Sequence, residues 1–344
     1  MHVGCPKEIK PQEFRVGLTP DAVQELVGRG HRVSIQAGAG TGAGFTDPDY
    51  TAAGAEIAPD AASVFAAADM IVKVKEPQAG ERAMLRGGQL LFTYLHLAPD
   101  PDQTRDLLAS GATAIAYETV TDARGGLPLL APMSEVAGRL APQMGAWALQ
   151  KANGGRGVLL GGVPGVQPAR VVIIGGGVVG TAAARVAVGM GADVTVLDRS
   201  LARLSYIDDI FMGRLKTQHS NTGAIADLLP TADMVIVTGG SGHSGQDFAR
   251  KFITEQADSI LADSVRCAPG HPTLLTSRTT SRGTQLVVGA PGNPLAAHVA
   301  LHSFALLAVA VASGQDFFPT QTCLTTSDFP PIRKDRVRLI PVAL

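Results

Sequence analysis

The chain of 344 residues has little cysteine, few aromatic side chains and almost no net charge. Its three cysteines, Cys5, Cys267 and Cys323, lie far apart and form no CxxC motif or metal-ligand spacing. We therefore expect a reduced, cytoplasmic protein without a bound metal. A net charge of −1 gives no footprint for nucleic acid or a membrane surface. An aromatic content of 5% also disfavours a base-stacking platform.

Long hydrophobic runs are missing as well. The most apolar late run, residues 299–312, is interrupted by His302 and Ser303 and is too short to span a bilayer. The charged N-terminus, with Lys7, Glu8 and Lys10, argues against a secretory signal peptide. Apolar residues make up 45% of the chain, so it can bury a large core, and its length predicts two domains.

Short β-rich runs alternate with helical patterns over the first 130 residues, which predicts an α/β domain with a parallel sheet. Strands are expected over 31–36, 68–75, 90–97 and 113–117. A helix is expected from Thr19 to Gly28, with Thr19 as N-cap and Pro20 at the first helical position. A long helix over 132–152 leads to a second α/β domain from residue 169, whose third strand is expected over 234–238.

The most informative stretch is 170–200, in which an apolar run ends in Gly175-x-Gly177-x-x-Gly180. These glycines suit a tight turn, a close backbone approach to a pyrophosphate, and close packing of helix on strand. The helix that starts at Val178 and Val179 offers free N–H groups to an anion. Asp198 ends the next apolar run, where a carboxylate can bind ribose hydroxyls. The stretch predicts a dinucleotide site and favours NAD over NADP, although Arg199 stands beside the acid.

Motifs along residues 1–237 resemble the alanine dehydrogenase and nicotinamide nucleotide transhydrogenase family. They include VGCPKEIKPQEFRVGLTP, IVKVKEP, LFTYLHLA, PMSEVAGR, GGRGVLLGGVPGV and the glycine stretch. The resemblance implies a substrate domain over 1–130 and a Rossmann-like NAD-binding domain over 131–237. It also implies NAD-dependent oxidative deamination of L-alanine to pyruvate and ammonium, a small-molecule substrate, and a possible homo-oligomer.

The same resemblance implies roles for three side chains around the substrate. Arg15 would bind the substrate carboxylate, with an ion pair to Glu13 as the alternative. Lys75 would bind substrate and take part in catalysis; Lys73 lies on the same side of an expected strand, so spacing alone leaves both open. His96 would be the general acid and base, because imidazole titrates near neutral pH.

On the cofactor side, the resemblance implies contacts from Ser134 and Ser220. A plain helix cap is the alternative for Ser134, which stands near the start of the long helix. Together with Gly175, Gly177, Val178, Val179, Gly180 and Asp198, these residues form the expected cofactor site.

After Val237 the chain departs from this family, and the segments that carry its catalytic aspartate and a substrate-side asparagine have no match. Residues 233–342 are instead similar to the molybdenum-insertion family of molybdopterin biosynthesis. The similarity rests on Thr238-Gly239-Gly240 with Asp247, on 265–273, on 289–294 and on 335–342. We expect 238–314 to complete the sheet as a molybdopterin-binding-like α/β segment and 315–344 to form a tail.

Three interpretations remain open at this point. The chain is a working dehydrogenase, in which Asp247 or Asp263 stands in for the missing aspartate. It is a fusion protein that binds NAD or a pterin with little chemistry. Or it is the non-functional product of a rearranged gene.

Overall fold

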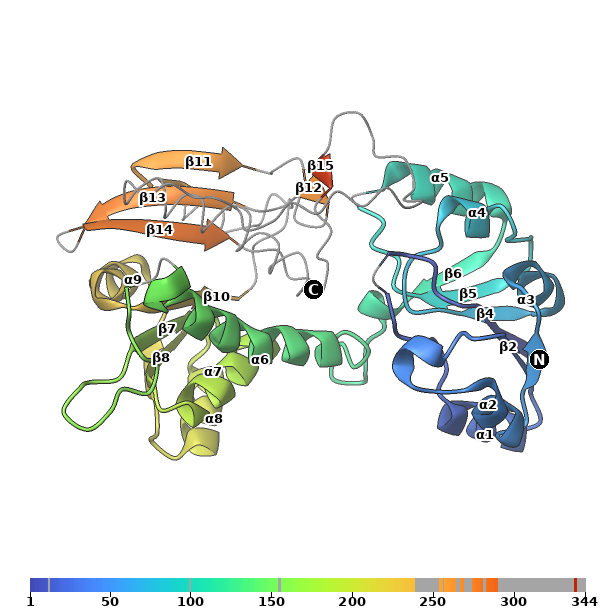
Figure 1. The fold of residues 1–344 in the computed structure, drawn as a ribbon, viewed down its shortest axis with the longest axis horizontal. Helices are drawn as coiled ribbons and strands as arrows, with labels where there is room; N and C mark the ends of the chain where they lie inside the picture. The colour runs from blue at the N-terminus through green and yellow to red at the C-terminus, as the bar shows by residue number, and fades with distance from the viewer. Residues whose placement is uncertain are drawn as a thin grey trace. The chain divides into compact units, whose positions relative to one another are not determined.

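The computed structural model describes residues 1–11, 13–98, 100–153, 156–238, 254–255, 257–263, 267–268, 274–280, 283–289 and 337–338. Its contacts divide the chain into two compact units, Met1–Pro132 and Met133–Leu344. The division falls beside the boundary expected after residue 130. Each unit carries its own parallel sheet (Figure 1).

The first unit is built on a six-stranded parallel sheet with the order β3-β2-β1-β4-β5-β6. Its strands are β1 (His2–Cys5), β2 (Arg32–Gln36), β3 (Glu56–Ala58), β4 (Met70–Val72), β5 (Leu90–Thr93) and β6 (Thr113–Ala116). All four strands expected in this region are present. The order reverses between β1 and β4, and ligands of such sheets bind beyond the carboxyl ends of the strands at that reversal.

Short helices and turns connect these strands. They are α1 (Pro20–Gly28), η1 (Thr41–Ala43), α2 (Asp47–Ala52), α3 (Ala61–Ala67), α4 (Ala79–Arg82), α5 (Pro101–Ser110) and η2 (Tyr117–Thr119). Helix α1 begins as expected, because the Thr19 side chain accepts a hydrogen bond from the N–H of Ala22 and Pro20 occupies the first turn. Two buried clusters, one with Val3 and Ile35 and one with Ile71 and Leu91, form the core of this unit.

Two expected strands of this unit end early. β4 stops at Val72 rather than residue 75, and β5 stops at Thr93 rather than residue 97. His96 has a φ of 47°, a left-handed conformation that a strand does not permit. The residues beyond both strands therefore form loops at the carboxyl edge of the sheet.

The second unit contains a four-stranded parallel sheet with the order β10-β7-β8-β9. Its strands are β7 (Arg170–Ile174), β8 (Asp193–Asp198), β9 (Lys216–His219) and β10 (Met234–Val237). Its helices are α6 (Ala131–Ala148), α7 (Val178–Gly189), α8 (Leu201–Phe211) and α9 (Thr222–Leu228), with η3 (Lys151–Asn153) and η4 (Leu229–Thr231). Helix α6 ends four residues before the expected end at 152.

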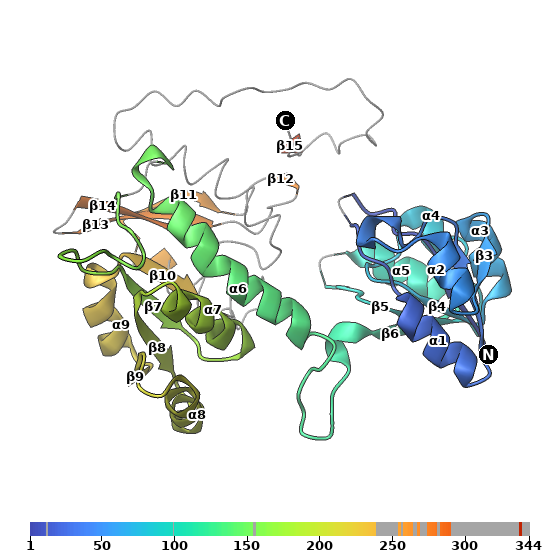
Figure 2. The ribbon, with the colours of Figure 1, turned by 60° about the horizontal axis from the view of Figure 1, so that its bottom comes forward.

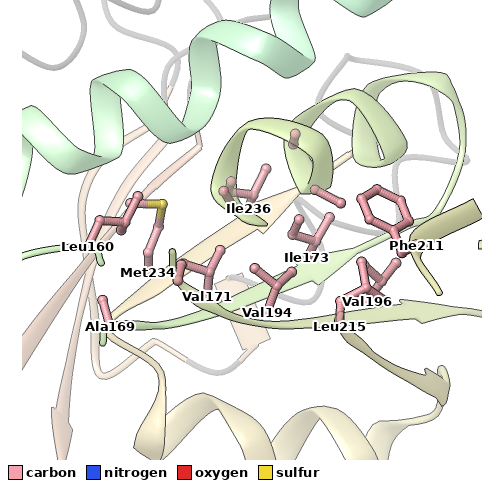
Figure 3. Packing of buried hydrophobic residues seen from close by; sticks show 14 of the residues in the cluster. Leu160, Ala169, Val171, Ile173, Val194, Val196, Phe211, Leu215, Met234 and Ile236 are labelled. Carbon is pink, nitrogen blue, oxygen red and sulfur yellow. The ribbon is translucent and has the colours of Figure 1, made fainter. Parts of the chain in front are cut away.

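Alternating residues of β7 pack on the two faces of this sheet. Val171 and Ile173 belong to the larger core, which also contains residues of α7 and α8 (Figure 3). Val172 belongs to a smaller cluster that includes Ala224 of α9. Because both faces are covered, the strand reads as a continuous apolar run, as buried parallel strands do. Helix α6 lies beside α7 (Figure 2).

The expectation that residues 234–238 form the third strand of this domain was wrong. β9 precedes them as the third strand along the chain, and β10 is the fourth. The sequence of β9, Lys-Thr-Gln-His, lacks apolar residues, because it is an edge strand and most of its side chains are exposed. A polar edge strand gives no alternating pattern from which it could be predicted.

The described strands after β10 form sheets of their own. β11 (Ser259–Asp263), β13 (Leu274–Thr280) and β14 (Gly283–Gly289) pair antiparallel in the order β11-β13-β14, and β12 (Cys267–Ala268) pairs with β15 (Val337–Arg338). Within the described residues, this arrangement differs from the expected completion of the parallel sheet. Most of 238–314 and 315–344 lies outside the described residues.

Candidate functional site

The carboxyl edge of the first sheet gathers charged side chains from several loops. Glu8, Lys10 and Arg15 follow β1, and Lys73, Lys75 and Glu76 follow β4. Tyr94 and His96 follow β5, and Glu118 lies just after β6. Parallel strands bring these loops together at the reversal between β1 and β4. The three substrate-side residues expected from the sequence, Arg15, Lys75 and His96, therefore lie on the same edge.

A cavity of about 340 Å³ opens at this edge. Its lining includes the cationic side chain of Arg15 and the aromatic side chains of Phe45, Tyr94 and Tyr117, whereas Lys75 and His96 lie outside it. Such a lining offers an anion partner together with apolar walls, which suits a small carboxylate-bearing molecule.

Arg15 forms the ion pair with Glu13 that was the alternative to substrate binding. Its Nε and Nη2 donate to the two carboxylate oxygens of Glu13 at 2.7 and 2.6 Å. These hydrogen bonds to Glu13 raise the pKa of the Arg15 guanidinium. A guanidinium has five N–H donors, so further donors stay available to a carboxylate. Arg15 thus lines the cavity while Glu13 holds its orientation.

Lys73 and Lys75, the two lysines that spacing alone left open, have different surroundings. Lys73 is fully buried, and its Nζ donates to Glu81 Oε1 at 2.6 Å and to Glu8 Oε2 at 3.2 Å. Lys75 is only partly buried. Burial and the neighbouring Lys10 lower the pKa of its ammonium. Lys73 is therefore held inside the unit by carboxylates, and Lys75 is the less buried of the two lysines.

The turn that carries His96 is fixed by the carboxylate of Glu118. Glu118 Oε1 accepts the N–H of Leu95 at 3.2 Å and the N–H of His96 at 2.7 Å. Gln103 Nε2 donates to the Leu95 carbonyl at 2.6 Å. Partial burial and the charge of Lys75 lower the pKa of the imidazole. Both effects favour the neutral ring, the form that can accept a proton.

The second unit shows the geometry that the glycine stretch predicts. Gly175 has a φ of 103°, which side-chain-bearing residues rarely adopt. A Cβ on Gly180 would lie 1.8 Å from the Gly175 carbonyl oxygen, so only glycine permits this packing. A Cβ on Gly177 would meet no heavy atom within 4 Å. The N-terminus of α7, with Val178 and Val179, follows directly and leaves its first N–H groups for an anion.

Asp198 and Ser220 lie beside this turn, at the ends of β8 and β9. Asp198 Oδ2 accepts the N–H of Gly176 at 2.7 Å, and the Ser220 N–H donates to the Asp198 carbonyl at 2.9 Å. The structure thus brings both expected residues to the carboxyl edge that carries the glycines. Ser134 lies in the first turn of α6, not at its N-cap, and its cofactor contact stays a prediction.

Arg203 of α8 is a contact of the glycine turn that sequence reasoning missed. Its Nε donates to the Gly176 carbonyl at 2.5 Å and its Nη2 to Thr181 Oγ1 at 2.7 Å. The side chain also lies over the ring of Tyr206, 4.7 Å from its centroid. The sequence signal for this contact was the position of Arg203, one turn after the helix cap Ser200.

Several expected positions fall where the structure gives no description. Asp247 and nearly all of the motifs at 239–240, 265–273, 289–294 and 335–342 lie outside the described residues. Asp263 ends β11, and its side chain is not among the described ones. No helix of the described residues is long and apolar enough to cross a membrane.

Fold and site together define a two-unit α/β protein with a dinucleotide-type glycine turn in one unit and a cationic cavity in the other. Family models match the same division: "Alanine dehydrogenase/PNT, N-terminal domain" over 4–137 and "Alanine dehydrogenase/PNT, C-terminal domain" over 141–243. Over residues 4–243 the chain therefore belongs to the alanine dehydrogenase/PNT family. A third model, "Probable molybdopterin binding domain", matches 218–310. Both expected resemblances are confirmed.

Curated relatives are similar over the same region. The chain is 58% identical over 236 residues to an alanine dehydrogenase of Halomonas elongata, covering 69% of this chain and 64% of that protein. It is 56% identical over 236 residues to one of Mycobacterium tuberculosis, with the same two coverages. The chain thus spans less than two thirds of the length of these relatives.

Solved structures show the same similarity. An L-alanine dehydrogenase matches with a TM-score of 0.65 and 53% identity, over 68% of this chain and 65% of that one. A transhydrogenase from Sinorhizobium meliloti matches with a TM-score of 0.58 and 26% identity, over 69% of each chain.

Proposed function

We propose that this protein catalyses NAD-dependent oxidative deamination of L-alanine to pyruvate and ammonium, and the reverse reaction. The observation that carries the proposal is the convergence of Arg15, Lys75 and His96 on the carboxyl edge of the first sheet, in a unit that matches this family. Arg15 also lines the cavity at this edge. The balanced reaction takes L-alanine, NAD⁺ and water to pyruvate, ammonium, NADH and one proton.

In this proposal, each of the three side chains at this edge has its own role in the reaction. Arg15 binds the substrate carboxylate through donors that Glu13 leaves available. Lys75, partly desolvated, donates a hydrogen bond to the carbonyl or imine of the substrate and polarises it. His96 accepts a proton during deamination and returns it in the reverse direction, because its lowered pKa favours the neutral ring.

The glycine turn of the second unit fits a dinucleotide. The space beside Gly177 admits a pyrophosphate, the N-terminus of α7 supplies N–H donors, and Asp198 lies where the ribose would bind. When bound, NAD accepts the hydride of the substrate Cα. Gly176, Ser220 and Ser134 complete the cofactor site in this proposal.

The proposal is tested by NADH oxidation at 340 nm with pyruvate and ammonium, against a blank without pyruvate. Turnover supports the dehydrogenase. Its absence from protein that melts cooperatively and binds NADH refutes it and supports a nucleotide-binding protein without turnover. Because the segment that carries the family's catalytic aspartate has no match here, we expect slower turnover than in the full-length relatives. Asp247→Asn and Asp263→Asn then test which acid contributes.

A second candidate function follows from the match of 218–310 to a molybdopterin-binding domain. In that case the C-terminal half binds a pterin nucleotide and serves molybdenum-cofactor synthesis. Calorimetric titration of the full chain with a pterin nucleotide tests it, and NADH serves as the comparison ligand. Heat from NADH alone counts against this candidate.

The proposal also includes a cytoplasmic location and a homo-oligomer, both expected from the sequence. Light scattering tests the assembly, and a monomeric mass would remove the oligomer from the proposal.

A further inference from the structure

The two carboxylate oxygens of Glu76, four residues beyond the end of β4, have different partners. Oε1 accepts a hydrogen bond from Lys10 Nζ. Oε2 is buried and has no hydrogen-bond donor within the described part of the chain. A buried carboxylate oxygen without a donor is costly, by about 1–3 kcal/mol. This oxygen therefore needs a donor.

The ring of His96 is placed to supply that donor. Glu76 Oε2 lies 3.9 Å from His96 Nδ1. This distance is within the range of an ion pair but too long for a hydrogen bond. Hydrogen bonds at catalytic residues are often long in the absence of substrate and shorten when it binds. Such a shortening of this separation would give a hydrogen bond between Nδ1 and Oε2.

The main chain of His96 is already fixed. Glu118 accepts its N–H, and its φ of 47° is held within a turn that Gln103 also binds. Only the side-chain torsions of His96 remain to be set. A carboxylate that faces one ring nitrogen sets them, and it also selects which nitrogen carries the proton.

We propose that Glu76 is the positioning residue for His96. Its Oε2 accepts a hydrogen bond from the Nδ1–H group of the imidazole, which leaves Nε2 to exchange a proton with the substrate. Lys10 holds Glu76 from the other side through Oε1. This inference rests on the proposed function, in which His96 is the general acid and base.

The charges around His96 determine whether each substitution raises or lowers the pKa of its imidazole. Apart from burial, Lys75 and Lys10 lower the pKa of the imidazole, whereas Glu118 and Glu76 raise it. Tyr94 is a further titratable neighbour, with ring centroids 6.0 Å apart. Removal of the Glu76 charge therefore lowers the His96 pKa further. Removal of the Lys10 charge raises it.

The test compares Glu76→Gln and Lys10→Met in the full chain. The pH profile of kcat/KM for alanine oxidation reports the base of the free enzyme. We expect its acid limb to move down by roughly half to one pH unit in E76Q and up by a similar amount in K10M. We also expect kcat of E76Q to fall about tenfold with little change in KM, and E76D to recover part of the loss. Equal profiles in all variants would overturn the proposal.

Glu56→Gln is the matched control. Glu56 also pairs with a cation, Arg32, but both side chains are exposed at the edge of the sheet. E56Q is expected to keep the wild-type profile. If E56Q shifts the profile as E76Q does, the effect is unspecific and the assignment fails.

Nitrogen NMR of the histidine rings separates this inference from the proposed function. The resonance of His96 is assigned by its loss in His96→Asn, and its tautomer and pKa are then measured without turnover. We expect the Nδ1–H form in the wild type and a loss of that preference in E76Q. An unchanged tautomer and pKa in E76Q refutes the Glu76 assignment even in an active enzyme. If the tautomer changes but the wild type shows no turnover, the proposed function fails and the pairing stands.

Discussion

A side chain is expected to have different effects at two glycines of the same turn. At Gly180 it should lower stability, and at Gly177 it should weaken NADH binding. A Cβ on Gly180 would lie 1.8 Å from the Gly175 carbonyl oxygen and 3.3 Å from Ile173 Cγ2. The first contact is with backbone and cannot be relieved by a rotamer change. A Cβ on Gly177 would meet no heavy atom within 4 Å.

Gly180→Ala should therefore destabilise the second unit by about 3 kcal/mol, at the upper end of the usual cost of overpacking. Gly177→Val should change stability by only about 0.5 kcal/mol, as an exposed substitution does. Its side chain fills the space that a pyrophosphate would use, so NADH binding should fall at least tenfold, which is about 1.4 kcal/mol.

Urea denaturation measures the stability of each variant, and NADH fluorescence titration measures binding. Gly189→Ala is the control, because Gly189 lies in the same helix and its added Cβ also meets no heavy atom within 4 Å. Wild-type NADH affinity in Gly177→Val would refute the dinucleotide site. Wild-type stability in Gly180→Ala would refute the close packing of α7 on its turn.

Three further substitutions test other parts of the site. Lys75→Ala should abolish turnover and leave NADH binding intact, because Lys75 belongs to the substrate side; weaker NADH binding would contradict its role. Asp198→Ala should weaken NAD more than NADP in paired titrations, and an equal loss argues against a ribose contact. Lys73→Met should lower the free energy of unfolding by about 3–5 kcal/mol in urea, because it leaves the buried Glu8 and Glu81 unpaired; a neutral effect would contradict a structural triad.

Local patterns were sufficient for the α/β class, the parallel sheets and the glycine turn. The structure contains the strand before Gly175 and the start of α1 at Thr19 and Pro20. Both features depend on residues that are close together in the sequence. The motifs around Arg15, Lys75 and His96 nominated the substrate side through their resemblance to the family. In the structure, Lys75 and His96 lie three residues beyond the ends of β4 and β5, and Arg15 lies in the longer loop after β1.

The separation of Lys73 from Lys75 required the tertiary structure. Both lysines have the same spacing, and only the arrival of Glu8 from β1 and Glu81 from α4 makes one of them an internal ion-pair partner. The polar strand β9 also could not be found from periodicity, because most of its side chains are exposed and need not be apolar.

The sequence by itself determined most of the elements and the nucleotide turn, because those depend on φ preferences, caps and periodicity within a few residues. The candidate substrate residues came from motifs that resemble the family. Only the tertiary structure decided which charges meet. The pairing of Glu76 with Lys10 and His96, the Glu118 clamp on the His96 turn, and the contact of Arg203 with Gly176 all join segments that are distant in the chain. Long-range contacts of this kind depend on the packing of the sheet and leave no local signature.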